Sequence, residues 1–442
     1  MTYFFETYGC QMNKAESAAL ELVLKERGWT AAGSGEEADL VLLNTCSVRA
    51  TAEQRVMGRI ALYASLKKKR EFRLVVAGCM AERLKDGLRD KAPAVDHVMG
   101  TQARSVFPLI IDSIESGEPV RVTDEAPAFS FSSSHLEEGD FRSFVPIMHG
   151  CDNFCSYCIV PYVRGREVSR SPRSILDEIA LLEDRGVREI TLLGQNVNSY
   201  RWEEGGKAVD FPFLLALVAE RVEESGIRWV RFLSSHPKDL SSEAIAVMRD
   251  HPVLCRHLHL CVQHGSNRIL QAMNRRYTRE RYLELVDEIR TALPDSSLST
   301  DILIGFPGET EDDVEETLDL MREVRFAYAY MYHYNPREGT AAYALSGRVS
   351  EPVKRERLAR VIELQQSHTK EAMKSRLGRT ATVLVEGLSR RNEAELVGRT
   401  ARDEMVVFPG AASLIGSFAL VPLLSLRGTT FRAKEAVPCP GA

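Results

Sequence analysis

The chain has 442 residues, enough for two or three domains, and its 44% apolar and 27% charged residues are typical of a folded globular protein. The formal net charge of −5 argues against binding nucleic acid with the whole surface, although it is compatible with a local basic face. Nine cysteines, no signal-peptide pattern and no long apolar run exclude disulfide-stapled secreted proteins and membrane-spanning proteins, so we expect a cytoplasmic protein whose thiols are reduced and in part bind metal.

The first hundred residues repeat one pattern three times. Short apolar runs each lead into a stretch with helical character, and these runs lie at residues 3–8, 38–45 and 72–78. Buried strands that alternate with helices predict a parallel sheet. Each run is closely followed by a cysteine: Cys10, Cys46 and Cys79. Because the carboxyl ends of parallel strands share one edge of a sheet, we expect the three thiols to converge there; three unrelated core cysteines are the alternative.

Larger strand–helix units follow a polar segment at residues 117–137, which is rich in Pro, Ser and acidic residues and is predicted to be a linker. Strand-like runs then alternate with helix-like runs, at residues 144–150, 189–195, 227–235, 257–263, 297–307 and 327–336. Six such units favour a partial (βα)6 barrel. A charged helical stretch follows, and short strands and turns from about residue 379 predict a small all-β barrel.

The sharpest motif is a C-x3-C-x2-C loop made by Cys151, Cys155 and Cys158, directly after a strand. Three thiolates at this spacing can hold three irons of a cubane cluster and leave the fourth iron open, as catalysis requires. A structural zinc site is the alternative, with His149 as a possible fourth ligand. It fits poorly, because structural zinc normally takes four ligands at other spacings.

This loop, set on the first strand of a β–α barrel, resembles that of the radical S-adenosylmethionine (SAM) enzymes. The resemblance implies a [4Fe–4S] cluster whose open iron binds the methionine moiety of SAM, and whose electron releases a 5′-deoxyadenosyl radical. It also implies that Tyr157 lies near the adenine, with a core tyrosine as the alternative, and that a turn with Gly305, Pro307 and Gly308 contacts SAM. Other polar residues at expected strand ends are either ligand contacts or strand-end hydrogen-bonding groups: Gln195, Asn196, Ser234, Ser235 and Gln263.

The motifs around Cys10, Cys46 and Cys79 (TYGCQMN, NTCSVR and AGCMAE) narrow the resemblance to the radical SAM methylthiotransferases. The resemblance implies a second [4Fe–4S] cluster held by only these cysteines, with an open iron that presents sulfur to a carbon radical. It further implies two SAM molecules per product, one as methyl donor and one as radical source. We expect catalysis to rest on the chemistry of the cofactors, and we nominate no side chain as a general base.

The carboxyl-terminal part resembles a TRAM domain, an RNA-binding barrel. Its candidate phosphate contacts, for which ordinary surface charge is the alternative, are Arg390, Arg391, Arg399, Arg402 and Arg427. Arginines just beyond the cluster loop are expected to meet RNA near the radical: Arg164, Arg166, Arg170 and Arg173. The match covers the whole chain in the family's order. The expected parts are an amino-terminal α/β domain at 1–116, a linker at 117–137, a radical SAM core at 138–368 and a TRAM domain at 371–434.

Motifs such as PYVRGREVSR and LLGQNVNSY resemble the branch of the family that acts on tRNA. The implied reaction places a methylthio group on C2 of N6-dimethylallyladenosine at position 37 of the anticodon loop. Alternatives are a threonylcarbamoyl-modified tRNA adenosine, a ribosomal-protein aspartate, or a non-catalytic iron–sulfur electron carrier with an RNA-binding tail. We expect a monomer that takes electrons from a reductant such as flavodoxin or ferredoxin; the sulfur donor is not predicted.

Two residues depart from the family pattern, which has Pro and Ser where this chain has Cys261 and His264. Both lie beside the expected SAM or adenosine pocket, so they put its detailed shape in doubt without removing a cluster ligand. Cys255 and Cys439 match no motif and are interpreted, like Cys261, as ordinary thiols.

Overall fold

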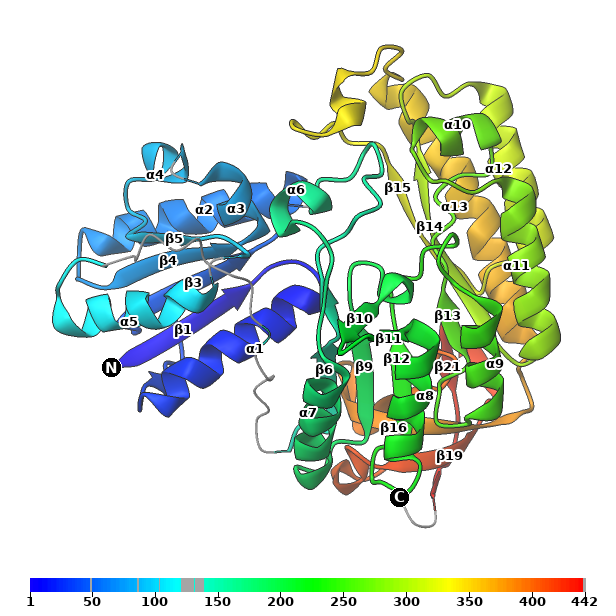
Figure 1. The fold of residues 1–442 in the computed structure, drawn as a ribbon. Helices are drawn as coiled ribbons and strands as arrows, with labels where there is room; N and C mark the ends of the chain where they lie inside the picture. The colour runs from blue at the N-terminus through cyan, green and yellow to red at the C-terminus, as the bar shows by residue number, and fades with distance from the viewer. Residues whose placement is uncertain (48–49, 86, 103, 121–130, 132–138, 440–442) are drawn as a thin grey trace.

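The fold is described from a computed structural model of the chain (Figure 1), which describes residues 1–439 except 48–49, 86, 103, 121–130 and 132–138. Most of the expected linker at 117–137 lies outside the described residues. No helix in the described part of the chain is long and apolar enough to cross a membrane.

The amino-terminal part is a parallel sheet with helices on both faces, as the sequence predicted. Within the described residues its strand order is β2-β1-β3-β4-β5 and every neighbouring pair is parallel. The strands are β1 (Thr2–Thr7), β2 (Thr30–Ala31), β3 (Leu40–Thr45), β4 (Arg73–Gly78) and β5 (His97–Met99). The helices are α1 (Gln11–Glu26), α2 (Ala50–Lys67), α3 (Cys79–Leu84), α4 (Gly87–Lys91) and α5 (Phe107–Ser116), preceded by the short η1 (Arg104–Val106).

Strand β3 shows why both faces are covered, because all its side chains are buried. Leu40 and Leu42 join the core beneath α1 and α5, whereas Val41 and Leu43 join the core beneath α2. Successive side chains of a strand point to opposite faces, so a strand that is apolar throughout needs a helical layer on each side.

The central part is an open barrel of parallel strands in the order β6-β9-β12-β13-β14-β15. Two sheets, β12-β9-β6 and β13-β14-β15, are joined by a parallel bridge between Ser235 and Leu260. The strands are β6 (Arg142–Pro146), β9 (Glu189–Leu193), β12 (Trp229–Phe232), β13 (His257–His259), β14 (Ser297–Ile304) and β15 (Tyr328–His333). The expected partial barrel is thereby confirmed.

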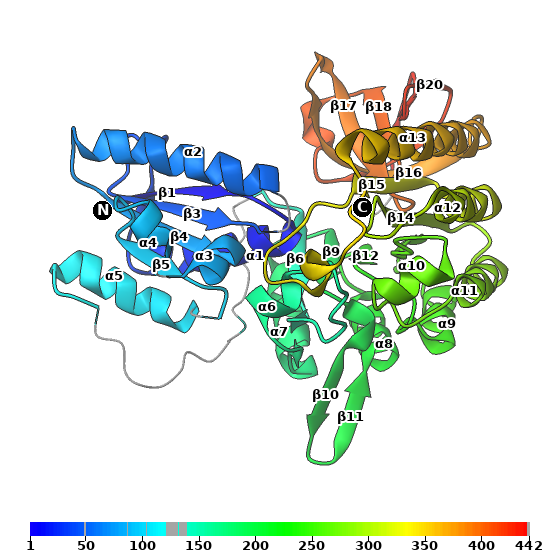
Figure 2. The same cartoon turned by 90° about the horizontal axis from the view of Figure 1, so that it is seen from above.

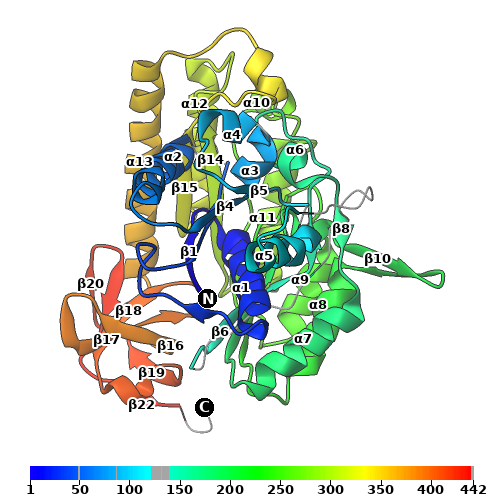
Figure 3. The same cartoon turned by 90° about the vertical axis from the view of Figure 1, so that its left-hand side faces the viewer.

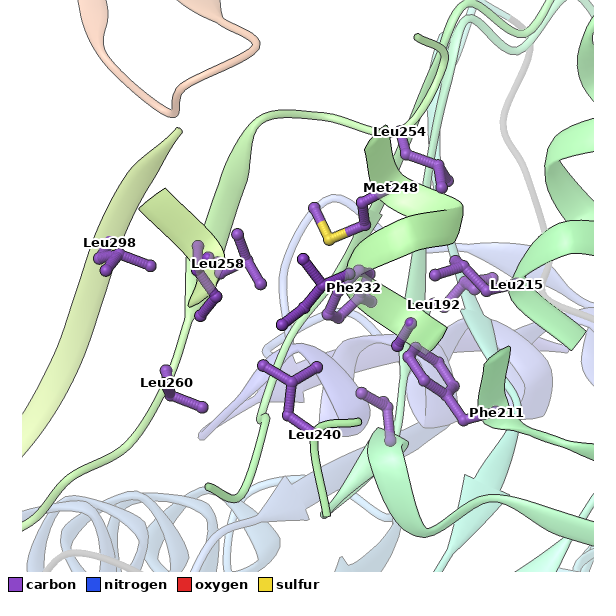
Figure 4. Packing of buried hydrophobic residues seen from close by; sticks show 14 of the residues in the cluster. Leu192, Phe211, Leu215, Phe232, Leu240, Met248, Leu254, Leu258, Leu260 and Leu298 are labelled. Atoms are coloured by element: carbon purple, nitrogen blue, oxygen red, sulfur yellow. The ribbon is translucent and has the colours of Figure 1, made fainter. Parts of the chain in front are cut away.

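Helices cover the outside of this barrel and bury one large core. Figure 4 shows part of it, where Phe232 and Leu258 from strands meet Leu215 and Met248 from helices. The helices are α7 (Pro172–Asp184), α8 (Phe211–Val222), α9 (Ser242–Asp250), α11 (Arg279–Ala292), α12 (Glu311–Val324) and α13 (Glu351–Lys374), which packs on β15. Smaller elements are β7 (Met148–His149), α6 (Val160–Arg164), β8 (Val168–Ser169), η2 (Val197–Ser199), β10 (Arg201–Glu204), β11 (Lys207–Asp210), α10 (Asn267–Ala272) and η3 (Ala341–Ala344). Figure 2 shows β10 and β11 projecting as a hairpin.

The carboxyl-terminal part is the expected small all-β unit. Its strand order, within the described residues, is β20-β21-β18-β17-β16-β19-β22 around a separate apolar core. The strands are β16 (Thr380–Ser389), β17 (Asn392–Thr400), β18 (Met405–Pro409), β19 (Phe418–Pro422), β20 (Ser425–Arg427), β21 (Thr430–Arg432) and β22 (Val437–Pro438), with η4 (Ala412–Leu414) before β19.

This β unit docks on the amino-terminal ends of the barrel strands. Trp229, the first residue of β12, packs edge-on against Phe418 with ring centroids 4.8 Å apart. Tyr328, the first residue of β15, donates a 2.7 Å hydrogen bond to Asp403. Figures 1 and 3 show the β16–β19 region at the end of the molecule opposite α6 and α10. The cluster loop, at the carboxyl ends of the strands, therefore lies away from the β unit.

Candidate active site

The cysteines of the C-x3-C-x2-C loop converge just beyond β7. Cys151 and Cys155 are buried and Cys158 is partly so. Burial, together with the charge of Cys155, raises the pKa of Cys151 to about 11 and that of Cys158 to about 12. Holding buried thiolates this close together costs free energy, because their negative charges repel each other and are removed from water. Binding to the iron of a cluster offsets this cost. The donor set therefore fits an iron–sulfur cluster.

A buried segment after α10 holds this loop in place and was missed by the sequence analysis. Arg275 places Nη1 3.3 Å from the Cys155 sulfur, and its Nη2 donates to the carbonyl of Cys261 at 2.7 Å. The side-chain amide of Asn274 donates to the carbonyls of Asn153 and Phe154 at 3.2 and 3.0 Å. The only sequence signal was the polar run NRR directly after a short helix, which carries no recognisable motif.

The amino-terminal cysteines also converge, at the carboxyl edge of β1, β3 and β4. Cys46 and Cys79 are 4% and 3% exposed, while Cys10 is exposed. Gly9 has a φ of +121°, and a Cβ on it would lie 2.7 Å from the Cβ of Cys46, so only glycine lets the two segments approach. Burial raises the pKa of Cys79, as do the neighbouring charges of Cys46 and Cys10, whereas Arg164 lowers it. These thiols form a second donor set of the same kind.

The amino-terminal triad adjoins the segment that follows the cluster loop, at the contact between the amino-terminal sheet and the barrel. Cys79 packs with Ile159 and Val163, and Ile159 directly follows the ligand candidate Cys158. Gln102 donates a 3.0 Å hydrogen bond to the carbonyl of Arg164 in α6. Figure 1 shows α6 lying next to α3, the helix that begins at Cys79.

The turn at Gly305 is tied together by an acid that the sequence analysis did not single out. Glu309 accepts hydrogen bonds through Oε2 from the backbone amides of Gly305 (2.7 Å) and Phe306 (3.4 Å), and its Oε1 accepts from Arg357 at 3.0 Å. His264, one of the two departures from the family pattern, lies 3.2 Å from the same Oε2. Gly305 itself has a φ of +77°, and a Cβ there would meet Lys354 at 2.4 Å.

Tyr157 links this turn to the cluster loop. It packs in one apolar cluster with Phe306 and Tyr334, and burial raises its pKa well above the usual value. Pro307 and Gly308 follow in the same turn, where the amide of Gly308 donates to the carbonyl of Gly347 at 2.8 Å. The predicted contacts of these residues with SAM remain predictions.

The polar residues expected at strand ends gather at the carboxyl edge of the barrel. Ser234 and Gln263 have left-handed backbones, with φ of +70° and +67°. Among the described residues, the side-chain oxygens of Gln195, Asn196 and Ser235 are buried without a hydrogen-bond partner. Buried polar atoms in native proteins are normally satisfied, so these oxygens indicate a polar ligand at this edge.

The structure corrects part of the expectation for arginines near the cluster. The prediction that Arg164 and Arg170 meet an RNA backbone is wrong, because both side chains are buried in ion pairs, with Glu16 and Glu178. Long side chains in such pairs are unavailable to a macromolecule. Arg166 and Arg173 remain accessible, with side chains 73% and 93% exposed.

The candidate phosphate contacts of the β unit divide in the same way. Arg390, Arg391 and Arg427 are exposed. Arg399 instead pairs with Asp403 at 2.6 Å, and Arg402 pairs with Glu404 at 3.3 Å. These two arginines serve the contact with the barrel, since Asp403 and the backbone of Arg402 both bond to barrel residues.

Family models match three segments of the chain. The Radical SAM superfamily matches residues 145–321, an uncharacterized protein family called UPF0004 matches residues 2–100, and the TRAM domain matches residues 374–432.

Relatives with the name tRNA-2-methylthio-N(6)-dimethylallyladenosine synthase match over nearly the whole length. The Treponema denticola protein is 51% identical over 98% of this chain and 99% of its own, and the Bacteroides fragilis protein is 46% identical over 98% and 95%.

Among solved structures, the radical SAM methyltransferase TsrM from Kitasatospora setae matches with a TM-score of 0.59 at 15% identity, over 77% of this chain and 73% of TsrM. The cobalamin-dependent radical SAM enzyme OxsB matches with a TM-score of 0.52 at 11% identity, over 83% of this chain and 56% of OxsB. At these identities the two structures show a shared fold.

Proposed function

The chain belongs to the tRNA-2-methylthio-N(6)-dimethylallyladenosine synthases, and from that membership we propose that it places a methylthio group on C2 of N6-dimethylallyladenosine at position 37 of tRNA. It is an enzyme, a radical SAM tRNA methylthiotransferase with a TRAM domain. The observation that carries the proposal is that Cys79 of one three-cysteine site packs against the residue that follows Cys158 of the other, because the reaction needs a radical source beside a sulfur carrier.

Both donor sets would hold a [4Fe–4S] cluster. Cys151, Cys155 and Cys158 would ligate the first, and the amino-terminal cysteines Cys10, Cys46 and Cys79 would ligate the second. Bound together with SAM, the first cluster supplies the electron that generates a 5′-deoxyadenosyl radical, and the second supplies an iron position for sulfur. Two SAM molecules are consumed per product, one for the methyl group and one for the radical.

The protein's own part is to bind, orient and keep out water. The oxygens of Gln195, Asn196 and Ser235, which are buried without a hydrogen-bond partner, would accept hydrogen bonds from SAM at the carboxyl edge of the barrel. The Glu309-braced turn and Tyr157 would flank the adenine end of the same ligand. Arg275 and Arg164 each bring a buried positive charge to one triad, which favours the anionic thiolates of a bound cluster.

The tRNA would present a splayed adenine between the two triads, since a stacked base hides its C2 edge. Arg166 and Arg173 are exposed beyond the cluster loop and suit contacts with the anticodon-loop backbone. Arg390, Arg391 and Arg427 on the TRAM domain would add affinity without choosing the base. We further propose that the protein acts in the cytoplasm as a monomer and takes electrons from a reductant such as flavodoxin or ferredoxin.

Nucleoside mass spectrometry of total tRNA tests this function. Deleting the gene should remove 2-methylthio-N6-dimethylallyladenosine and accumulate its unthiolated precursor. Wild-type protein should restore the nucleoside, whereas a Cys155→Ala variant should not. An unchanged level of this nucleoside in the deletion strain would refute the substrate assignment. The loss of a methylthio group would then be sought in threonylcarbamoyl-modified tRNA adenosines and in a ribosomal-protein aspartate.

A further inference from the structure

Polar residues line the inner face of the barrel on β13 and β14, and none of them belongs to either cysteine triad. Leu258, Leu260 and Leu298 point outward into the core beneath the helices. Side chains alternate along a strand, so His259 and Cys261 point to the opposite, inner face. His259 pairs with Ser299 in the parallel register between β13 and β14. Two residues further along both segments, Cys261 therefore lies opposite Asp301.

This register brings three ligand-type side chains together: His259, Cys261 and Asp301. Within the described part of the chain, they form the single group of three or more His, Cys, Asp or Glu side chains whose ligand atoms all lie within 4.8 Å of one another. The Cys261 sulfur is 3.4 Å from Asp301 Oδ2, and His259 Nε2 is 3.6 Å from the same oxygen. Ligand atoms about 2.0–2.3 Å from a tetrahedral zinc lie about 3.3–3.8 Å from one another, so the observed separations match a metal site.

The surroundings orient these groups as they do in known metal sites. Ser299 Oγ lies 2.9 Å from His259 Nδ1, which leaves Nε2 to face Cys261 and Asp301. A fixed partner on the far nitrogen is what selects the tautomer of a metal-bound histidine. The carbonyl of Cys261 accepts hydrogen bonds from Arg275 at 2.7 Å and from Tyr277 at 3.2 Å, so its backbone is held as well.

The group is partly open rather than sealed. The side chains of His259 and Asp301 are 11% and 28% exposed. Three protein ligands with access to a fourth position are the arrangement of a catalytic zinc site, whereas structural zinc is enclosed by four. One imidazole, one thiol and one carboxylate suit zinc better than Mg²⁺ or Ca²⁺, which prefer oxygen ligands.

We propose that His259, Cys261 and Asp301 bind one divalent metal ion of the zinc type, with a fourth position open to the barrel interior. This site is separate from both cysteine triads and uses a cysteine that the family pattern does not contain. The sequence interpretation of Cys261 as an ordinary thiol is then replaced by a metal-binding role. The proposal stands whether or not the assignment of the tRNA substrate is right.

Metal analysis of the purified protein with both clusters reconstituted tests the proposal. The protein is incubated anaerobically with ZnCl2, passed over a chelating resin and analysed for zinc and iron. The wild type should retain about one zinc per chain more than the Cys261→Ser and Asp301→Asn variants. These two substitutions keep the size of the side chain but weaken the ligand set. Cys255→Ala, which removes a buried thiol elsewhere, should retain as much zinc as the wild type. Equal iron in all four proteins would show that the substitutions leave the fold and clusters in place.

The same zinc content in the wild type and in both ligand variants, whether one ion or none, would overturn the proposal. Zinc X-ray absorption of the wild type gives a test that does not depend on any variant. We expect one sulfur neighbour at about 2.3 Å and nitrogen or oxygen neighbours at about 2.0–2.2 Å. A shell of sulfur alone would instead assign the zinc to cluster cysteines and would equally overturn the site.

Discussion

Arg164 and Glu16 form a buried ion pair across the contact between the barrel and the amino-terminal sheet. Nη1 of Arg164 is 2.6 Å from Glu16 Oε1, and the side chains are 3% and 4% exposed. Nη2 also donates to Asn13 at 3.1 Å, and Asn13 in turn accepts from the thiol of Cys10. One arginine from the radical-cluster side thus positions the helix that follows the first cysteine of the other triad.

Replacing Arg164 with Met should separate the two half-reactions. Removing one partner of a buried ion pair typically costs about 3–5 kcal/mol of stability. Here the loss would weaken the contact between the amino-terminal sheet and the barrel. We expect continued 5′-deoxyadenosine release, but about 100-fold less methylthiolated tRNA, because small misplacements of reacting groups cost that much. Arg281→Met, which breaks an exposed ion pair with Glu284, is the matched control. Product formation at the wild-type rate in Arg164→Met would contradict the role given to this pair.

The two triads should fail differently when one cysteine is removed. If the proposed ligand sets are right, Cys155→Ala and Cys79→Ala should each lose about four irons per chain, because each would remove one ligand of a [4Fe–4S] cluster. Only Cys155→Ala should abolish 5′-deoxyadenosine formation from SAM under reducing conditions, since Cys79 is assigned to the proposed sulfur-bearing site. Cys439→Ala should change neither quantity. Iron analysis and chromatography of the nucleoside products measure the two quantities. Loss of 5′-deoxyadenosine in both the Cys155 and the Cys79 variant would argue against distinct roles for the two triads.

Arg275→Gln should lower the reduction potential of the radical cluster. Arg275 Nη1 lies 3.3 Å from the sulfur of Cys155, a proposed cluster ligand. A cation there would stabilise the reduced, more negative state of the cluster, so its removal should make reduction harder. The expected shift is about 60 mV for every 1.4 kcal/mol of lost stabilisation, read in a redox titration followed by electron paramagnetic resonance. The neighbouring Arg276→Gln, which alters an exposed residue, should leave the potential unchanged. A shift of equal size in both variants would mean a general effect of surface charge.

Glu309→Gln should weaken SAM binding without disturbing the clusters. The carboxylate accepts two backbone amides of the turn and the guanidinium of Arg357, and an amide group cannot satisfy all three donors. Hydrogen bonds to charged groups contribute about 1.5–3 kcal/mol, so the dissociation constant should rise about 10- to 100-fold. Equilibrium dialysis of the reconstituted protein measures it, with the exposed Glu284→Gln as control. Unchanged affinity would place SAM away from this turn.

Arg231→Met should loosen the TRAM domain. Arg231 pairs with Glu189 at 2.7 Å and donates to the carbonyls of Thr400 and Ala401 at 2.8 and 3.1 Å, all at the amino-terminal end of the barrel. Loss of the guanidinium leaves the buried carboxylate of Glu189 without its ion-pair partner. We therefore expect faster proteolytic cleavage between α13 and β16 and weaker tRNA binding. Arg249→Met, which breaks an exposed pair with Asp250, should behave as wild type. Equal cleavage rates would show that other contacts dominate the docking.

Local sequence by itself determined the architecture and the convergence of the cysteines, whereas their role as cluster ligands stays a prediction. Buried apolar runs followed by helices predicted both parallel units, and a cysteine after each of three strands predicted the convergence of Cys10, Cys46 and Cys79. This succeeded because strand–helix alternation is a short-range pattern, and parallel strands bring their carboxyl ends to one edge whatever the loops between them.

Tertiary structure alone decided which polar side chains are available and which meet across the barrel. Arg164 and Arg170 look like surface charges in the sequence, but partners 148 and 8 residues away bury them. The approach of Arg275 to Cys155, and of Cys261 to Asp301, likewise joins segments 120 and 40 residues apart. Such contacts depend on strand order, register and domain docking, which are set by packing across the whole chain and leave no local motif.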